Sequence, residues 1–149
     1  MSSDPTMELL IERAREDYET CSRNLGIATA QRDHQQQKHR MLEEYREEYR
    51  NKLEEHASTG MDIAAMINYR RFLTQLDQAV EQQGTLLQQA EGAIEFARHQ
   101  WQEANRRLKS YEILETRRIV ARERIVARKE QNESDSYAQR IAMTRKLPF

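Results

Sequence analysis

Proline is nearly absent from the chain, since it occurs only at Pro5 and Pro148. A proline inside a helix removes a hydrogen bond and clashes with the preceding turn, so its absence leaves almost the whole sequence able to form helix. Glycine is also scarce, and its four residues are isolated from one another. We therefore expect long helices and no glycine-rich loop of the kind that binds phosphate groups.

Cysteine and long apolar runs are missing as well. Cys21 is the single cysteine, which excludes an internal disulfide and fits a reducing cytosol. Hydrophobic residues make up 38% of the chain and charged residues 33%, with a mean hydropathy of −1.00. No run approaches the length of a membrane span, and the N-terminal MSSDPTMELL lacks the order of a signal peptide. We expect a protein that stays inside the cell without membrane insertion.

The apolar residues that are present step by four and three, the heptad spacing of a coiled-coil seam. Helix one is predicted over about residues 5–57, with Asp4 as its N-cap and Pro5 at its first position. Helix two is predicted from about residue 62. The two seams consist of Met7, Ile11, Ala14, Tyr18, Cys21, Leu25, Ala28, Leu42, Tyr49 and Leu53 in helix one, and Tyr69, Leu73, Leu76, Val80, Leu87, Ala90, Ile94, Ala97, Trp101, Ala104, Leu108 and Tyr111 in helix two.

A turn is predicted at about residues 57–62, where Gly60 can adopt the left-handed conformation and Thr59 or Asp62 can cap helix two. Two residues that face each other in an antiparallel hairpin are separated from the centre of its turn by the same number of residues. One register fits the seams and is centred on residue 59, pairing among others Tyr49 with Tyr69, Leu42 with Leu76, Ala28 with Ala90, Tyr18 with Trp101 and Met7 with Tyr111. The predicted fold is all-α: one two-helix antiparallel coiled-coil hairpin over residues 1–149, monomeric by itself.

The middle of the helix-one seam is polar, with Arg32, Gln35 and His39 at seam positions that face Leu87, Gln83 and Val80 in the predicted register. Polar seam residues fix register and partner number at some cost in stability. His34 and His39 are five residues apart and share no helix face, so they do not form a metal pair. We find no catalytic residues, no metal site, no cofactor site and no concave pocket in such a hairpin, and predict that the chain is not an enzyme.

A second stripe runs beside the seam of helix two, through Phe72, Leu76, Ala79, Gln83 and Leu86. The predicted register places Tyr45 level with Phe72 and Tyr49 level with Tyr69, so four aromatic residues gather near the turn. Such a stripe is either a wider seam or a docking surface for another protein. Periodicity alone does not decide between the two.

Beyond Tyr111 helix two has no predicted partner, because the facing residues would have numbers below 7. This overhang is basic: between Arg117 and Lys129 it has one acidic residue against six basic ones, namely Arg117, Arg118, Arg122, Arg124, Arg128 and Lys129. Such an imbalance is typical of a solvated helix or of a helix that binds an acidic or mixed surface. The segment EQNESDS then predicts a break, and residues from about 131 to 149 are expected to form a flexible tail.

The segments YREEYRNKL, INYRRFLTQLDQA and YAQRIAM, with the length and the hairpin layout, resemble the FliJ family of the bacterial flagellar type III export apparatus. The resemblance covers about residues 38–145 and implies a fold similar to the stalk subunit of rotary ATPases. It implies contact with the hexameric export ATPase, with the cytoplasmic part of the export-gate subunit FlhA, and with export chaperones. Gln83 and Lys38 depart from the histidine and glutamine that the family pattern has there.

The resemblance also assigns residues to these contacts. The gate-binding positions correspond to Tyr45, Tyr49, Phe72, Leu76 and Ala79, and the basic overhang would enter the ATPase ring. The implied location is the cytoplasm, at the inner face of the membrane at the flagellar base. Three alternatives remain open: an injectisome-type secretion stalk, a basic-armed coiled coil that binds nucleic acid, and a plain structural spacer. No nucleic-acid binding is predicted, because the basic arm lacks base-reading residues such as asparagine.

Overall fold

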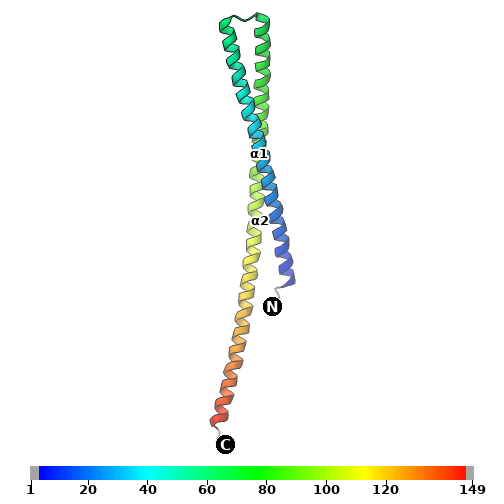
Figure 1. The fold of residues 1–149 in the computed structure, drawn as a ribbon. Coiled ribbons are helices and arrows are strands. Elements are labelled where there is room, and N and C mark those ends of the chain that lie inside the picture. The colour runs from blue at the N-terminus through cyan, green and yellow to red at the C-terminus, as the bar shows by residue number, and fades with distance from the viewer. Residues whose placement is uncertain (1–3, 147–149) are drawn as a thin grey trace. The chain divides into compact units, whose positions relative to one another are not determined.

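The computed structural model describes residues 4–146, which form two helices joined by a tight turn (Figure 1). Helix α1 spans Pro5–Thr59 and helix α2 spans Ile63–Lys146. Each begins and ends within two residues of the predicted positions, except at the C-terminal end of α2. The all-α hairpin predicted from the heptad spacing is therefore confirmed.

Asp4 is the N-cap of α1, as predicted. Its carboxylate Oδ1 accepts a hydrogen bond from the backbone N–H of Thr6 at 3.1 Å, and its carbonyl accepts the first helical bond, from the N–H of Glu8, at 3.0 Å. These bonds satisfy backbone donors that the first turn of a helix leaves without intrahelical partners.

The turn depends on Gly60, whose φ of 90° is in the left-handed region. A side chain there would meet no atom within 4 Å, so glycine is required by the backbone conformation and not by crowding. Of the two predicted caps for α2, Asp62 takes the position, since its carbonyl accepts the N–H of Met66 at 3.0 Å. Thr59 instead ends α1, where its hydroxyl donates to the carbonyls of Glu55 and His56.

The chain divides into two compact units, and residues 18–103 form the first. Its core is a small cluster of Ala28, Ile94 and Ala97, against which Leu25 packs. Ring contacts confirm the predicted register at both ends of this unit: Tyr49 and Tyr69 have centroids 5.3 Å apart, and Tyr18 and Trp101 have centroids 5.8 Å apart.

A polar layer interrupts the apolar seam in the middle of this unit. Gln83 is 8% exposed, and its amide nitrogen donates to the carbonyl and to the side-chain oxygen of Gln35. Because an unpaired amide in a seam would lose its hydrogen bonds to water, this pair favours the one register in which the two glutamines meet. The predicted pairing of Gln35 with Gln83 is confirmed.

The second unit comprises residues 1–17 and 104–149, of which 4–17 and 104–146 are described. Ala14, Ala104 and Leu108 are buried between its two helical segments. Pairing continues past Tyr111, where we predicted that it would stop: the Arg118 guanidinium donates to Asp4 Oδ2 at 3.1 Å. The register of the two helices places no residue opposite Arg118, but its long side chain still reaches Asp4.

The predicted break after Lys129 is wrong. Helix α2 continues without interruption to Lys146, so the residues from 131 to 146 that we expected in a flexible tail are helical. Residues 147–149 lie outside the described part of the chain. The helix persists because no proline or glycine follows Gly92 until Pro148, and Gln131 donates to Asp135 one turn further on, at 3.1 Å.

Candidate docking surfaces

The two surfaces predicted from the sequence belong to different units of the chain. The first is the tip patch, which we define as Tyr45, Tyr49, Phe72, Leu76 and Ala79, all in the unit of residues 18–103. Its rings form one connected cluster. Tyr49 lies 4.4 Å from Phe72 between centroids, and Tyr45 meets Phe72 edge to face at 6.4 Å.

The residues of the tip patch differ in how far their side chains are exposed to solvent. Leu76 is buried at 7% exposure and belongs to the seam, while Tyr45 is 47% exposed. Tyr49, Phe72 and Ala79 are partly buried. Phe72, which we expected to be turned to the side, packs across the hairpin on both tyrosines, so the second stripe is also a wider seam. Tyr45 is therefore the residue of the patch with the most ring surface available to a partner.

A shallow groove of about 360 Å³ adjoins the tip patch and is lined by Lys38, Met41, Leu42, Tyr45 and Gln83. Met41 is 61% exposed there, although the sequence analysis did not select it. Its signal was its position one helical turn before Tyr45 on the same face. The groove extends the apolar surface around Tyr45 along α1.

The other side of the same unit is ionic. Arg46 and Arg50 both approach Asp77 of α2, at 3.6 and 4.0 Å. The two sides of the hairpin near the turn thus differ in chemistry: one presents rings and the groove, and the other presents charges paired across the helices. A protein that buries apolar surface fits the first side better.

The second surface is the basic arm, residues 117–129 of α2, in the unit of residues 1–17 and 104–149. Its predicted ATPase-facing residues differ in their surroundings. Arg118 bonds to Asp4, and both Arg118 and Arg122 hold the pKa of Asp4 below its ordinary value, after the larger effect of the Thr6 backbone N–H. The exposed members of the set are Arg117, Arg124, Arg128 and Lys129.

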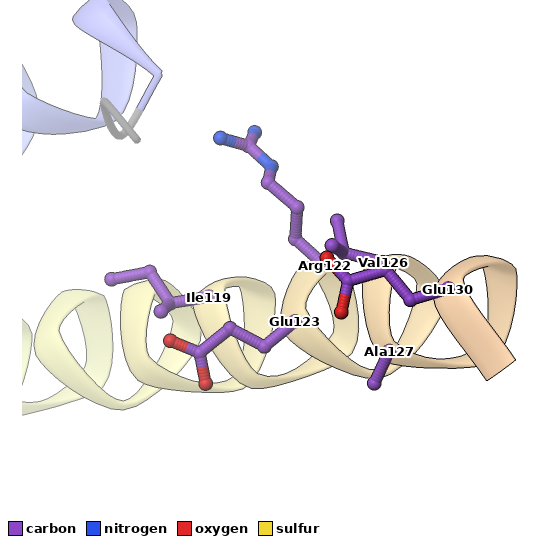
Figure 2. Close-up of a pocket in the computed structure, with 6 residues that line it drawn as sticks. All are labelled: Ile119, Arg122, Glu123, Val126, Ala127 and Glu130. Atoms are coloured by element: carbon purple, nitrogen blue, oxygen red, sulfur yellow. The ribbon is translucent and has the colours of Figure 1, made fainter. Parts of the chain in front are cut away.

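Figure 2 shows a face of the arm on which aliphatic and charged side chains lie together. A shallow hollow of about 340 Å³ is lined by six residues of α2, namely Ile119, Arg122, Glu123, Val126, Ala127 and Glu130. Ile119 and Val126 are 43% and 41% exposed. The face combines aliphatic side chains with charges of both signs, a composition that fits a protein surface better than a uniform row of phosphates.

Residues 4–146 offer neither a metal site nor a membrane span. No group of three or more His, Cys, Asp or Glu side chains there could hold a metal ion. Neither helix, over its described length, contains a stretch apolar enough to cross a membrane.

The sequence profile of the family described as "Flagellar FliJ protein" matches residues 3–147, which includes both helices and the turn. This match decides the family. The chain belongs to the FliJ family. It is accordingly a component of flagellar type III protein export, as the resemblance implied, and it is not an enzyme, as the sequence predicted.

Two relatives agree with this assignment, and one solved structure shares the fold. The flagellar FliJ proteins of Escherichia coli K12 and of Salmonella typhi are each 29% identical to the chain over 143 residues, which is 96% of this chain and 97% of theirs. The structure of a putative YscO homolog from Chlamydia trachomatis matches with a TM-score of 0.72, covers 100% of both chains and shares 14% of residues. At that identity the last match concerns the fold alone.

Proposed function

We propose that this FliJ-family protein is a stalk-like coiled coil that links the hexameric export ATPase to the cytoplasmic part of the export gate FlhA and escorts export chaperones. The observation that carries the proposal is the presence of two chemically different surfaces in two separate units: an aromatic tip patch and a basic arm. A plain spacer needs neither surface.

The tip patch is the proposed contact for the export gate. Tyr45 supplies an exposed ring held by Tyr49 and Phe72, and such a ring loses little conformational entropy on binding. The adjoining groove adds Met41, whose flexible thioether adapts to irregular partner surfaces. Leu76 acts indirectly in this proposal, because it is buried and supports the helix that presents Phe72 and Ala79.

The basic arm is the proposed contact for the ATPase ring. Arg117, Arg124, Arg128 and Lys129 are exposed and carry charge toward an acidic or mixed surface, while Ile119 and Val126 add apolar contact area. Arg118 and Arg122 have a second role, since they interact with Asp4 at the start of α1. The protein would work at the cytoplasmic face of the inner membrane, associated peripherally at the flagellar base.

The gate contact is tested by Tyr45→Ala. We expect this change to weaken binding of the purified cytoplasmic part of FlhA by about 10-fold, the scale of an interface anchor, because a half-exposed ring is removed from the patch. Thermal unfolding should change little. The measurement is a titration calorimetry or interferometry experiment beside a thermal melt of the same sample.

A matched control is available at Tyr137, which is 65% exposed in the other unit. Tyr137→Ala removes the same ring from a helix and should leave gate binding unchanged. Phe72→Ala should lower both gate affinity and melting temperature, because Phe72 packs on two tyrosines. Equal gate affinity for wild type and Tyr45→Ala would remove the tip patch from the proposal.

A further inference from the structure

Helix α2 carries more apolar residues than a two-helix seam requires. Beside the seam, at steps of seven, lie Phe72, Ala79, Leu86 and Ala93. A helix that packs against one neighbour needs two apolar positions per heptad, whereas a helix that packs against two neighbours needs a third. In α2 an apolar residue occupies this third position in four successive heptads, which continue well past the tip patch.

The side of the hairpin that carries this stripe is nearly free of charge. The positions that face it, which we call the uncharged flank, are Thr20, Asn24, Ile27, Gln31, His34, Lys38, Met41 and Tyr45 on α1, and Phe72, Gln75, Ala79, Gln82, Leu86, Gln89, Ala93, Phe96 and Gln100 on α2. Lys38 is the only Lys, Arg, Asp or Glu among them, in a chain of which 33% is charged. Depletion of charge is the compositional mark of the core of a protein interface.

The opposite flank of the same unit provides the comparison. It carries Arg40, Glu43, Arg50, Asp77, Glu81, Glu91, Glu95 and Arg98, and ion pairs form there, such as Arg98 with Glu95 at 2.7 Å. Large apolar side chains are exposed on the uncharged flank instead: Phe96 at 68%, Met41 at 61%, Ile27 at 57% and Leu86 at 46%. Stability of the hairpin does not require these residues to be apolar, since they are open to solvent.

We infer that the uncharged flank binds a single amphipathic α-helix of a partner protein, laid along α2 from Phe72 to Phe96. The inference rests on the proposed function, because it extends the gate-binding tip patch into a longer binding surface. The stripe alternates large and small residues, so a partner helix with large apolar side chains at heptad spacing would fill the gaps over Ala79 and Ala93. Lys38, which lines the groove, would form an ion pair with a carboxylate at the margin of that helix.

Two other occupants fit less well. An extended strand needs a free sheet edge for its backbone, and the described residues of both helices offer none. A second copy, flank against flank, would bring α1 into the interface and bury Asn24, Gln31 and Lys38, whereas one helix seated on α2 leaves them at the rim.

The first experiment separates this inference from the proposed function. Ala93→Arg places a charge on the uncharged flank outside the tip patch, and Gln88→Arg places the same charge on the opposite face of the same helix. Both positions are exposed, so both variants should melt like the wild type. We expect Ala93→Arg to weaken binding of the cytoplasmic part of FlhA by about 10-fold and Gln88→Arg to leave it unchanged.

The second experiment tests that the occupant is a helix. A photo-crosslinking amino acid is placed in the full-length chain at Ala79, Leu86 or Ala93, with Glu81, Gln88 and Glu95 as controls, and the crosslinked partner residues are located by mass spectrometry after irradiation in the host. Seven residues of helix rise about 10.5 Å, a distance that about three residues of extended chain cover. Successive positions should therefore crosslink to one partner at residues about seven apart.

The two experiments distinguish failure of the inference from failure of the proposed gate contact. If Tyr45→Ala weakens gate binding and Ala93→Arg does not, the inference is overturned and the proposed gate contact stands. If the wild type binds no gate protein, the proposed contact fails, and the crosslink spacing alone decides the inference. Three results would overturn the inference that the uncharged flank binds a helix. They are a crosslink spacing near three residues, crosslinks to a second copy of this chain, and equal crosslinking from the control positions.

Discussion

Asp4 is the residue whose role the structure enlarges most. The sequence marks it as an N-cap, and the structure adds a bond from Arg118, one hundred and fourteen positions away in the chain. One carboxylate therefore satisfies the first turn of α1 and also joins α1 to the start of the basic arm. Both interactions favour its ionised form, which is why its pKa lies below the ordinary value of 3.8.

The pH dependence of stability follows from that shift. A carboxylate whose folded-state pKa is lowered stabilises the fold above its unfolded-state pKa, and this contribution is lost as the pH falls through the folded-state value. Asp4→Asn keeps a capping side chain but removes the charge. We expect the wild type to melt at a higher temperature than Asp4→Asn at neutral pH, and the difference to disappear below pH 3.8 as the carboxylate is protonated.

The measurement is a series of thermal melts of both proteins between neutral and strongly acidic pH. Glu12→Gln is the control, because Glu12 is an exposed carboxylate of the same helix, two turns beyond the N-cap. A difference between wild type and Asp4→Asn that stays constant into acid would show that the charge of Asp4 contributes nothing.

At the scale of elements, the glycines give two opposite predictions. Gly60→Ala should destabilise the hairpin by about 1–2 kcal/mol, because a residue with a Cβ is strained at a φ of 90°. Gly26→Ala should stabilise it by about 0.5–1 kcal/mol, because Gly26 lies within α1 and an added methyl meets nothing within 4 Å.

Chemical denaturation of the three proteins checks both signs in one experiment. Because a methyl group at either position has open space around it, crowding does not contribute to the difference. Gly60→Asn serves as the control for the backbone explanation, since asparagine tolerates the left-handed region better than alanine and should recover part of the loss. A neutral Gly60→Ala would mean that the turn adopts another conformation.

The continuation of α2 beyond Lys129 shows the limit of local propensity. Asn, Ser and Asp in EQNESDS each favour helix less than alanine does, by fractions of a kcal/mol, and we interpreted their cluster as a break. Those penalties do not stop a helix that is already formed, because extension adds one hydrogen bond per residue fixed. Only proline and glycine impose larger costs, and the segment contains neither.

At the scale of the whole molecule, the proposal requires that the two surfaces act independently. We expect reversal of Arg117, Arg124 and Arg128 to glutamate to abolish stimulation of ATP hydrolysis by the cognate export ATPase while gate binding persists. These three arginines are exposed, whereas Arg118 and Arg122 interact with Asp4 and their reversal would also disturb the start of α1. Hydrolysis and gate affinity are measured on the same preparations.

The matched control reverses Arg13, Arg40 and Arg107, which are exposed arginines outside the arm, and so makes the same change in net charge. Stimulation should survive in the control and should weaken with salt in the wild type, since exposed charges are screened. Full stimulation by the arm variant would leave the arm without a role in the ATPase contact. Binding of arbitrary duplex DNA by the wild type would favour the nucleic-acid alternative.

The sequence by itself determined the hairpin, its turn and its register. Heptad spacing repeats the same local information many times, and Gly60 marks the turn by a backbone requirement that few other residues meet. Pairings such as Gln35 with Gln83 therefore followed from residue numbers alone.

Only the tertiary structure decided which side chains of each surface are available. Phe72 and Tyr45 look alike in the sequence, yet Phe72 packs on two tyrosines and is partly buried, whereas Tyr45 remains half exposed. Arg118 and Arg124 both belong to the basic repeat, yet only Arg118 is shown bonded to Asp4. Exposure and pairing depend on the direction and reach of side chains from two helices at once, and the spacing of residues along one helix does not contain that information.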